Sequence, residues 1–271
     1  MRGGGPDAAL VLAGRRGPAD WIPGGDAAAH KALLDVGGRP MLVRVVDALI
    51  GTRGIERVHV CIDDASVLER SDVLAARLAD GTLVPVDAAD SPSSSVGRFL
   101  ETCPRPSHVL VTAADHALLR PQWVEEFWSA AVRRAADVTV AMVTETRFRA
   151  SYPSERRTFL PLRGEGYSGA NLFSFRVPEG LAAASYWRRV EAHRKEPWRM
   201  AAAFGARTLL GFALRRYDID EAMARVSDVV GSKIGVVLLD EAEAAIDVDG
   251  PEDLAVVERL LAAEGPDSEA P

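Results

Sequence analysis

"LVLAGRRGPADWIPGGDAAAHKALLDVGGRP", Leu10–Pro40, is the stretch that decides the fold. An apolar run stops at Gly14, a long loop follows, and Lys31 precedes a second apolar turn. From Met41 onward, apolar residues recur at helical spacing, with Pro40 at the favoured first-turn position. A strand, a glycine-containing loop and an amphipathic helix in this order predict the start of a βαβ unit.

The same alternation continues through the first half of the chain. The further runs expected to be strands are RVHVCI, TLVPV, HVLVTA and VTVAMV, and amphipathic stretches separate them. Strands that alternate with helices of this length form right-handed crossovers and leave both faces of the sheet covered. The sequence therefore predicts an α/β fold with a Rossmann-like, mainly parallel open sheet and helices on both faces.

After Val143 the pattern changes. TFLPLRGEGYSGANLFSFR predicts two strands around a glycine-rich turn, and a helical region extends from about Leu181 to Gly231. IGVVLL and AAIDVD predict two more strands, followed by a helix from Pro251. We expect one domain with a nucleotide half at about 7–143, a partly antiparallel and helical acceptor-side elaboration at about 144–245, a closing strand and helix at 246–264, and a tail at 265–271.

Composition restricts the partners. The formal net charge of -7 argues against a nucleic acid, because binding to a phosphate backbone needs a basic face. The two cysteines have no CxxC spacing, which favours a reducing compartment. No stretch approaches the roughly 18 apolar residues of a membrane span. We expect a soluble, cytoplasmic protein that acts without a membrane or nucleic-acid partner.

Ligands of open α/β sheets collect beyond the carboxyl ends of the strands. Gly14 lies at such an end, where backbone N–H groups can point at phosphate oxygens while Arg15, Arg16 and Lys31 neutralise their charge. The loop has neither the GxGxxG nor the P-loop pattern, and a glycine after a strand is a weak motif. A phosphate-binding loop and a solvated surface loop are both open at this point.

Two aspartates follow expected strands. Asp115 and Asp249 could each hold Mg²⁺, a hard cation that prefers oxygen ligands, or could each cap a helix start. If they share one edge of the sheet, they could share one metal ion. His30 and His116 are interpreted as neighbours of the site rather than as ligands or bases.

Two further segments have a functional and a structural interpretation. The serines around Ser95 predict a helix start whose donors suit a base or ribose, although a capped loop has the same pattern. Asn171, which is expected at the start of a strand beside Gly169, could reach a sugar or phosphate, or could belong to a simple hairpin.

Six segments in this order resemble the MobA-like nucleotidyltransferases, which have the glycosyltransferase-A type of Rossmann-like fold. They are LVLAGRR, HKALLDVGGRPML, SPSSSVGRFL, VLVTAADHALL, SGANLF and AAIDVDGPEDL, and together they span about residues 7–262. The chain departs from the family pattern in the long loop over residues 15–30 and in His30, which replaces the usual proline before the lysine.

The resemblance implies a role for each matching residue. Lys31, Arg15 and Asp115 would be catalytic, and Asp115 and Asp249 would bind Mg²⁺, with Asp247 open as the alternative to Asp249. The nucleotide contacts would be Ala13, Gly14, Arg15, Arg16, Lys31 and Ser95, and the acceptor contacts Gly169 and Asn171.

The expected activity is Mg²⁺-dependent transfer of a nucleoside monophosphate from an NTP, CTP or GTP, to a small phosphorylated acceptor, with release of pyrophosphate. Two alternatives remain open. One is a nucleotide-sugar-dependent glycosyltransferase of the same fold, and the other is an inactive nucleotide-binding regulator, which the lengthened loop favours.

Overall fold

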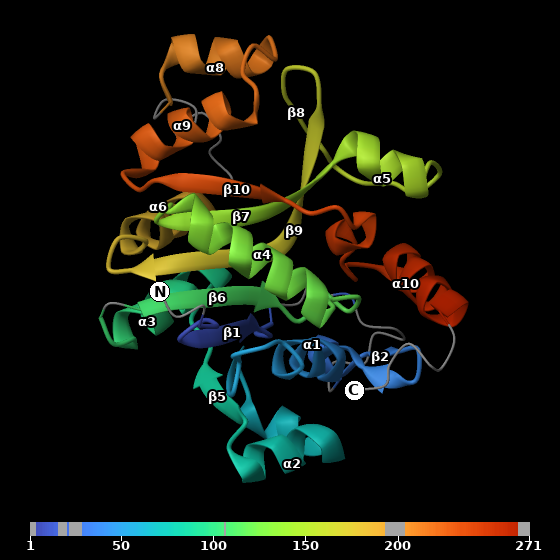
Figure 1. Ribbon diagram of the computed structural model, residues 1–271. Coiled ribbons are helices and arrows are strands. Elements are labelled where there is room, and N and C mark those ends of the chain that lie inside the picture. Colours follow the sequence, from blue (N-terminus) through green and yellow to red (C-terminus); the bar gives the residue numbers. More distant parts are fainter. Residues whose placement is uncertain (1–3, 16–20, 22–28, 106, 193–203, 265–271) are drawn as a thin grey trace.

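A computed structural model describes residues 4–15, 21, 29–105, 107–192 and 204–264. Its centre is an eight-stranded sheet with the order β10-β7-β9-β6-β1-β4-β5, and β8 pairs with β9 outside this path (Figure 1). Every pair is parallel except those that β9 forms with β6, β7 and β8. The predicted mainly parallel α/β sheet is therefore confirmed.

The first half follows the predicted alternation closely. A two-stranded ribbon of β2 and β3 precedes the first long helix, and two 3-10 turns interrupt the pattern. The elements are β1 (Ala8–Leu12), η2 (Lys31–Leu33), β2 (Asp35–Val36), β3 (Arg39–Pro40), α1 (Met41–Ile50), β4 (Val58–Ile62), η3 (Ala65–Arg70), α2 (Asp72–Asp80), β5 (Leu83–Asp87), α3 (Pro92–Thr102), β6 (Ser107–Ala113), α4 (Pro121–Arg134) and β7 (Val138–Thr144).

Successive residues of β1 pack on opposite faces of the sheet. Ala9 and Val11 belong to the core beneath α1 and α4, whereas Leu10 belongs to the core that α3 and α6 cover. All three are buried, because a parallel strand inside a sheet with helices on both sides exposes neither face. Burying a side chain such as Leu10 contributes roughly 1.5–3 kcal/mol.

The chain changes direction across the sheet between β1 and β6. From β1 it proceeds outward through β4 to β5, and α3 then returns it to β6 on the other side of β1. Leu12 pairs with Ala113 at the ends of these two strands. Such a switch point opens a crevice at the carboxyl ends, and Gly14 and Asp115, each two residues beyond that pair, lie at its mouth.

The second half adds antiparallel and helical structure, as predicted. β9 lies between β6 and β7 and runs against both of them. The elements are α5 (Glu145–Ser151), β8 (Leu160–Pro161), β9 (Gly166–Val177), α6 (Leu181–Ala192), α8 (Ala206–Ala213), α9 (Ile219–Val230), β10 (Ile234–Leu238), η4 (Ala242–Ala245) and α10 (Pro251–Glu264).

The predicted closing strand at AAIDVD is wrong. Residues 242–245 form the 3-10 turn η4, and residues 246–249 belong to no helix or strand. Ile246 and Val248 are nevertheless buried, so the alternating pattern reflects a segment that packs on the core. Alternation alone cannot distinguish such a segment from a strand in a ladder.

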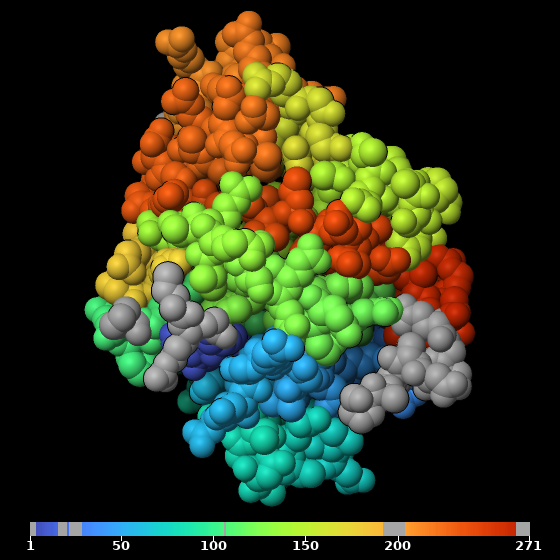
Figure 2. Space-filling model, in the orientation of Figure 1, coloured from blue at the N-terminus to red at the C-terminus, as the bar shows by residue number. Residues whose placement is uncertain are grey.

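The two ends of the sheet carry different structures. In the space-filling view, α4 lies across the middle of the visible face, the helices of residues 204–230 form one end and α2 lies at the other (Figure 2). No helix in the described ranges is both long and apolar enough to cross a bilayer.

β5 forms one edge of the sheet and contains Pro85. Val58 donates to the carbonyl of Thr82, and Ala88 donates to the carbonyl of Ile62. The backbone groups of even-numbered β5 residues therefore face β4, and Pro85 lies at an odd position whose backbone faces outward. An edge strand tolerates proline at such a position because no N–H is needed there.

His108 in β6 lies at the amino end of the strand. Its ring contacts Trp128 of α4 at a centroid distance of 4.3 Å, and its backbone exchanges hydrogen bonds with Asp7. Burial, together with the nearby Arg176 guanidinium, lowers the pKa of His108 from 6.5 to about 4. The folded protein therefore keeps this imidazole neutral in a range where the unfolded chain protonates it.

We predict that His108→Phe makes stability less sensitive to acid. A lowered imidazole pKa means that the unfolded state binds more protons below pH 6.5, so wild type loses stability as the pH falls from 6.5 towards 4. Phe keeps a ring against Trp128 and does not titrate. Urea unfolding across this range should give a smaller loss for the variant, and equal losses would contradict the assignment.

Candidate active site

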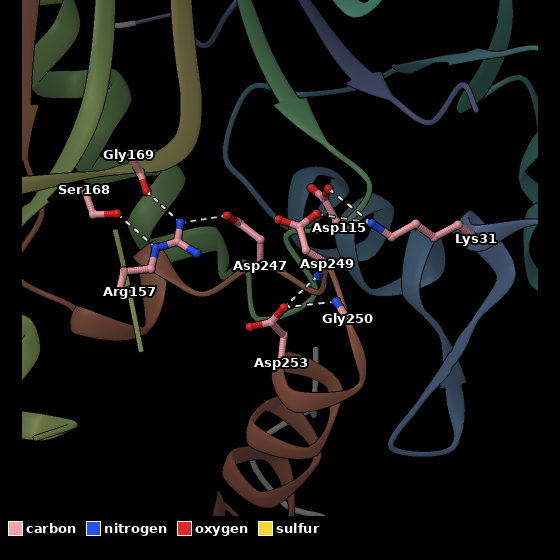
Figure 3. Close-up of polar contacts among 9 residues, drawn as sticks. All are labelled: Lys31, Asp115, Arg157, Ser168, Gly169, Asp247, Asp249, Gly250 and Asp253. Carbon is pink, nitrogen blue, oxygen red and sulfur yellow. Dashed lines mark hydrogen bonds and ion pairs between the residues drawn. The ribbon is translucent and has the colours of Figure 1, made fainter. Parts of the chain in front are cut away.

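Lys31 lies between two carboxylates from distant parts of the chain. Its Nζ is 3.8 Å from Oδ2 of Asp115 and 3.4 Å from Oδ1 of Asp249. Figure 3 shows both carboxylates directed at the ammonium group. The Lys31 and Asp115 side chains are 14% and 9% exposed, whereas that of Asp249 is 61% exposed. The mouth of the crevice therefore holds a cation between one buried and one open acid.

A backbone hydrogen bond brings the second acid to the first. The Val248 amide donates to the Asp115 carbonyl at 3.0 Å, which fixes the segment before α10 beside the turn after β6. Asp253 then accepts from the amides of Asp249 and Gly250 at 3.1 and 3.0 Å. A carboxylate at this position satisfies two of the amides that a helix start leaves free.

His30 fixes the position of Lys31. Its Nδ1 accepts from the Ala32 amide at 3.2 Å, which makes Nε2 the ring donor, and Nε2 lies 3.1 Å from Oδ1 of Asp63. Asp63 follows β4, so the buried imidazole ties the start of η2 to the neighbouring strand end. His30 thereby supplies by hydrogen bonding the constraint that a proline supplies by its ring.

Arg15 contacts the same aspartate. The Arg15 amide donates to Oδ1 of Asp63 at 3.1 Å, and its guanidinium donates to the carbonyl of Ala29 at 3.2 Å. Partial burial alone would raise the pKa of Asp63, but the hydrogen bonds from His30 and from the Arg15 amide outweigh it and lower that pKa. Arg15 therefore helps to close the ends of the 15–30 loop onto β4.

The remaining predicted loop contacts are only partly described. Ala13 is buried and Gly14 is half-buried, and both line a small cavity of about 40 Å³ that also reaches Lys31 and Asp115. Arg16 lies outside the described residues. Direct contact of these residues with a nucleotide stays a prediction.

The serine run begins helix α3, as predicted. Ser91 is the N-cap, and buried Ser95 accepts from the Ala89 amide at 2.9 Å, which holds the loop before the helix. Glu191 of α6 accepts from the Ser93 amide at 3.2 Å and from its hydroxyl. An acid therefore already lies at this helix start, and contact between Ser95 and a nucleotide stays a prediction.

A second ion pair lies beside the first. The Arg157 guanidinium is 2.8 Å from Oδ2 of Asp247, and its Nε donates to the Ser168 hydroxyl at 2.9 Å (Figure 3). Burial raises the pKa of Asp247 to about 7, although the Arg157 charge opposes this shift. Oδ1 of Asp247 is buried without a hydrogen-bond partner among the described residues.

The predicted acceptor contacts lie on β9 near this pair. The Gly169 carbonyl accepts from Nη2 of Arg157 at 3.4 Å. Asn171 is inside β9 rather than at a strand start, and its φ of +46° falls where the β7–β9 register shifts. Asparagine tolerates this left-handed conformation better than most residues do. An acceptor contact by either residue stays a prediction.

Asp115 does not cap a helix. Residues 114–120 contain turns and no helix, so the alternative role at a short helix before Pro121 is wrong. His116 is fully buried, stacks on Trp123 at 6.4 Å and has a pKa lowered to about 3 by burial. A neutral, enclosed ring agrees with its interpretation as a neighbour of the site.

Within the described ranges, no three His, Cys, Asp or Glu side chains gather into a metal-binding group. Two carboxylates already lie around one cation, however, and carboxylate oxygens are the donors that Mg²⁺ prefers. The protein's contribution to a metal would therefore be two acids, with the other ligands from substrate and water.

A family model matches residues 9–228, more than half of the chain, and its description is MobA-like NTP transferase domain. The chain belongs to this family. It is therefore a nucleotidyltransferase, and the resemblance that the six motifs indicated is confirmed. Family membership agrees with a crevice at the β1–β6 switch point that contains a lysine and two acids.

The MobA-like chain has relatives along nearly its whole length. A 3-deoxy-manno-octulosonate cytidylyltransferase of Anaeromyxobacter dehalogenans is 26% identical over 256 residues, which cover 94% of this chain and 98% of the relative. A hypothetical transferase from Thermus thermophilus is 25% identical, with a TM-score of 0.71 over 91% of this chain and 98% of the other. The structure of CMP:2-keto-3-deoxy-manno-octonic acid synthetase complexed with CTP shares the fold, with a TM-score of 0.60 and 16% identity over 95% and 99% of the two chains.

The MobA-like motifs identified part of the site. Lys31, Asp115 and Asp249 were predicted and lie together. Arg157 was missed, because it follows a polar turn and no motif includes it. Two consecutive arginines shortly before an expected strand were the available signal. Asp63 and Asp247 also follow expected strands, but no sequence signal indicated their partners His30 and Arg157.

We predict that Lys31→Met lowers the free energy of unfolding by about 1–3 kcal/mol, because it leaves the buried Asp115 carboxylate without this cation. Asp249→Asn should cost less than about 1 kcal/mol, since that carboxylate is mostly exposed. Urea unfolding of both variants and of Lys31→Arg, which keeps the charge, measures the difference. An equal loss of unfolding free energy in Lys31→Met and Asp249→Asn would contradict the difference in burial between Asp115 and Asp249.

Proposed function

We propose that this enzyme transfers a cytidylyl group from CTP to a small anionic sugar-type acceptor and releases pyrophosphate. The observation that carries the proposal is the Lys31 ammonium between Asp115 and Asp249 at the switch-point crevice. The name of the Anaeromyxobacter relative supports CTP as the nucleotide and a sugar acid as one acceptor type. A phosphorylated acceptor is the other type that we consider.

In the proposed reaction, an acceptor oxygen attacks the α-phosphorus of CTP in line. A new P–O bond forms, the bond from the α-phosphorus to the bridging oxygen breaks, and pyrophosphate leaves with that oxygen. The protein has little covalent chemistry to perform, so catalysis rests on position and charge neutralisation. Lys31 would offset charge that builds up on the departing pyrophosphate, and the Gly14 amide would face its oxygens.

Mg²⁺ is part of this proposal. Asp115 and Asp249 would hold it, since they already surround a cation with hard oxygen donors. When bound, the ion would polarise the α-phosphate and orient it towards the acceptor. Arg157 forms an ion pair with Asp247, which favours Asp249 over Asp247 as the second Mg²⁺ ligand beside Asp115.

A glycosyltransferase of the same fold uses a nucleotide sugar and makes no pyrophosphate. Residues 113–115 read Ala-Ala-Asp, without the DxD motif at the end of the middle strand that such a glycosyltransferase would need.

We expect CTP with Mg²⁺ to raise the melting temperature of the protein more than ATP, GTP or UTP do, because a ligand that binds only the folded state stabilises it. Pyrophosphate release on addition of a sugar acid or polyol phosphate should follow, and stabilisation by a nucleotide sugar alone would favour the glycosyltransferase.

We predict that Asp115→Ala lowers the rate of pyrophosphate release at least about a hundredfold, because one of the two proposed Mg²⁺ ligands is lost and with it the charge stabilisation of the transferring phosphate. The fold should persist, since Val248 donates to the backbone carbonyl of residue 115 and not to its side chain. Circular dichroism checks the fold. Asp64→Ala is the matched control, because Asp64 is an exposed acid that follows β4, which β1 separates from β6 in the sheet. A Mg²⁺-dependent Asp115→Ala enzyme with full activity would refute the assignment.

A further inference from the structure

A cavity of about 490 Å³ lies beside the lysine and the two acids. Six of the residues that line it are Arg156, Arg157, Ser168, Asp247, Asp249 and Asp253. Asp249 lines this cavity, and its carboxylate contacts Lys31, which lines the small cavity beneath the Gly14 loop. The Lys31–Asp249 ion pair thus connects the two cavities, and it belongs to the group of residues at which the proposed transfer occurs.

The three acids of the cavity are each compensated. Asp247 pairs with Arg157, Asp249 pairs with Lys31, and Asp253 accepts from the two amides at the start of α10. Their charges therefore do not oppose an incoming anion as three free carboxylates would.

Two cationic groups remain available. Nη1 of Arg157 makes no hydrogen bond to any described residue, because its three bonds use Nε and Nη2. The exposed Arg156 side chain has no hydrogen-bond or ion-pair partner among the described residues. The three existing bonds hold the Arg157 fork in one orientation, and a fixed guanidinium suits recognition of a carboxylate or phosphate.

Gly169 leaves space on the β9 side. No described atom lies within 4 Å of the position that a Cβ would take there, and its φ is outside the left-handed range. Neither packing nor backbone conformation therefore requires glycine at this position. Gly169 is also exposed in a strand whose neighbouring residues, Ser168 and Ala170, are buried.

We propose that this cavity is the acceptor site, with the acceptor's anionic group against Arg157 Nη1 and Arg156. Its carbon skeleton would extend from the cavity over Gly169, which follows the lining residue Ser168. The assignment rests on the proposed cytidylyl transfer and adds to it the residues that would bind the carboxylate or phosphate of the acceptor, Arg156 and Arg157. Arg157 binds the acceptor, and Asp247 and Ser168 are positioning residues that hold Arg157.

The first test removes the cations. We expect Arg157→Gln and Arg156→Gln each to weaken acceptor binding about tenfold to a hundredfold, as loss of a hydrogen bond to a charged group implies. Arg157→Lys should recover only part of the affinity, because an ammonium cannot reproduce the fork. Arg163→Gln is the matched control, since Arg163 is ion-paired with Asp218 elsewhere. Arg156 makes no hydrogen bond or ion pair with a described residue, so its variant tests the site even if Arg157→Gln unfolds.

The second test fills the space. Gly169→Ala adds a methyl group that meets no described atom, so the fold should be unchanged while the KM for the acceptor rises about tenfold and the KM for CTP stays constant. Gly4→Ala is the control, because its Cβ also meets no described atom and it lies at the amino end of the sheet. An unchanged acceptor KM in Gly169→Ala would show that the acceptor does not lie over this residue.

Calorimetry separates the outcomes. The protein is loaded with α,β-methylene CTP, which cannot release pyrophosphate, and titrated with 3-deoxy-manno-octulosonate, glycerol 3-phosphate and inorganic phosphate. Binding of 3-deoxy-manno-octulosonate alone indicates that the site takes a carboxylate, and binding of glycerol 3-phosphate and inorganic phosphate indicates that it takes a phosphate. Either result supports the site if Arg157→Gln and Arg156→Gln abolish the binding. Binding that survives both substitutions, or no binding of any probe to wild type, overturns it. Failure of CTP to stabilise wild type would instead remove the proposed function.

Discussion

The hydrogen bond from the Val248 amide to the Asp115 carbonyl closes the site. Parallel strands alone bring Gly14 and Asp115 together, because β1 and β6 are neighbours in register. They do not bring Asp249, which comes from a segment outside every ladder. One backbone bond places this acid beside Asp115, and Asp253 fixes the backbone that follows.

Charge compensation governs the arrangement around that bond. Three acids around it have defined counterparts: Lys31 lies against Asp115, Arg157 against Asp247, and His30 with the Arg15 amide against Asp63. Without such partners, acids in this crevice would take up protons instead of carrying charge. The pKa of Asp247, raised to about 7 despite Arg157, shows how large the effect of burial is here.

The sequence predicted the sheet well because hydrophobic periodicity and chain connectivity determine it. It failed at residues 246–249, where apolar alternation came from packing on the core and not from strand pairing. The site residues were likewise only partly predictable. Lys31, Asp115 and Asp249 belong to recognisable motifs, whereas the role of Arg157 depends on three contacts with residues at other places in the sequence. Asn171 was placed at a strand start because a register shift inside a long strand leaves no local signal.

Pro85 has a consequence for self-association. The backbone of this exposed residue faces away from β4, and it has no N–H to offer to an incoming strand. A second molecule that tried to extend the sheet beyond β5 would find a gap in the row of donors, and the ring would obstruct its approach. Contacts between copies of this chain through that edge are thereby disfavoured, which protects a long sheet from polymerising side by side.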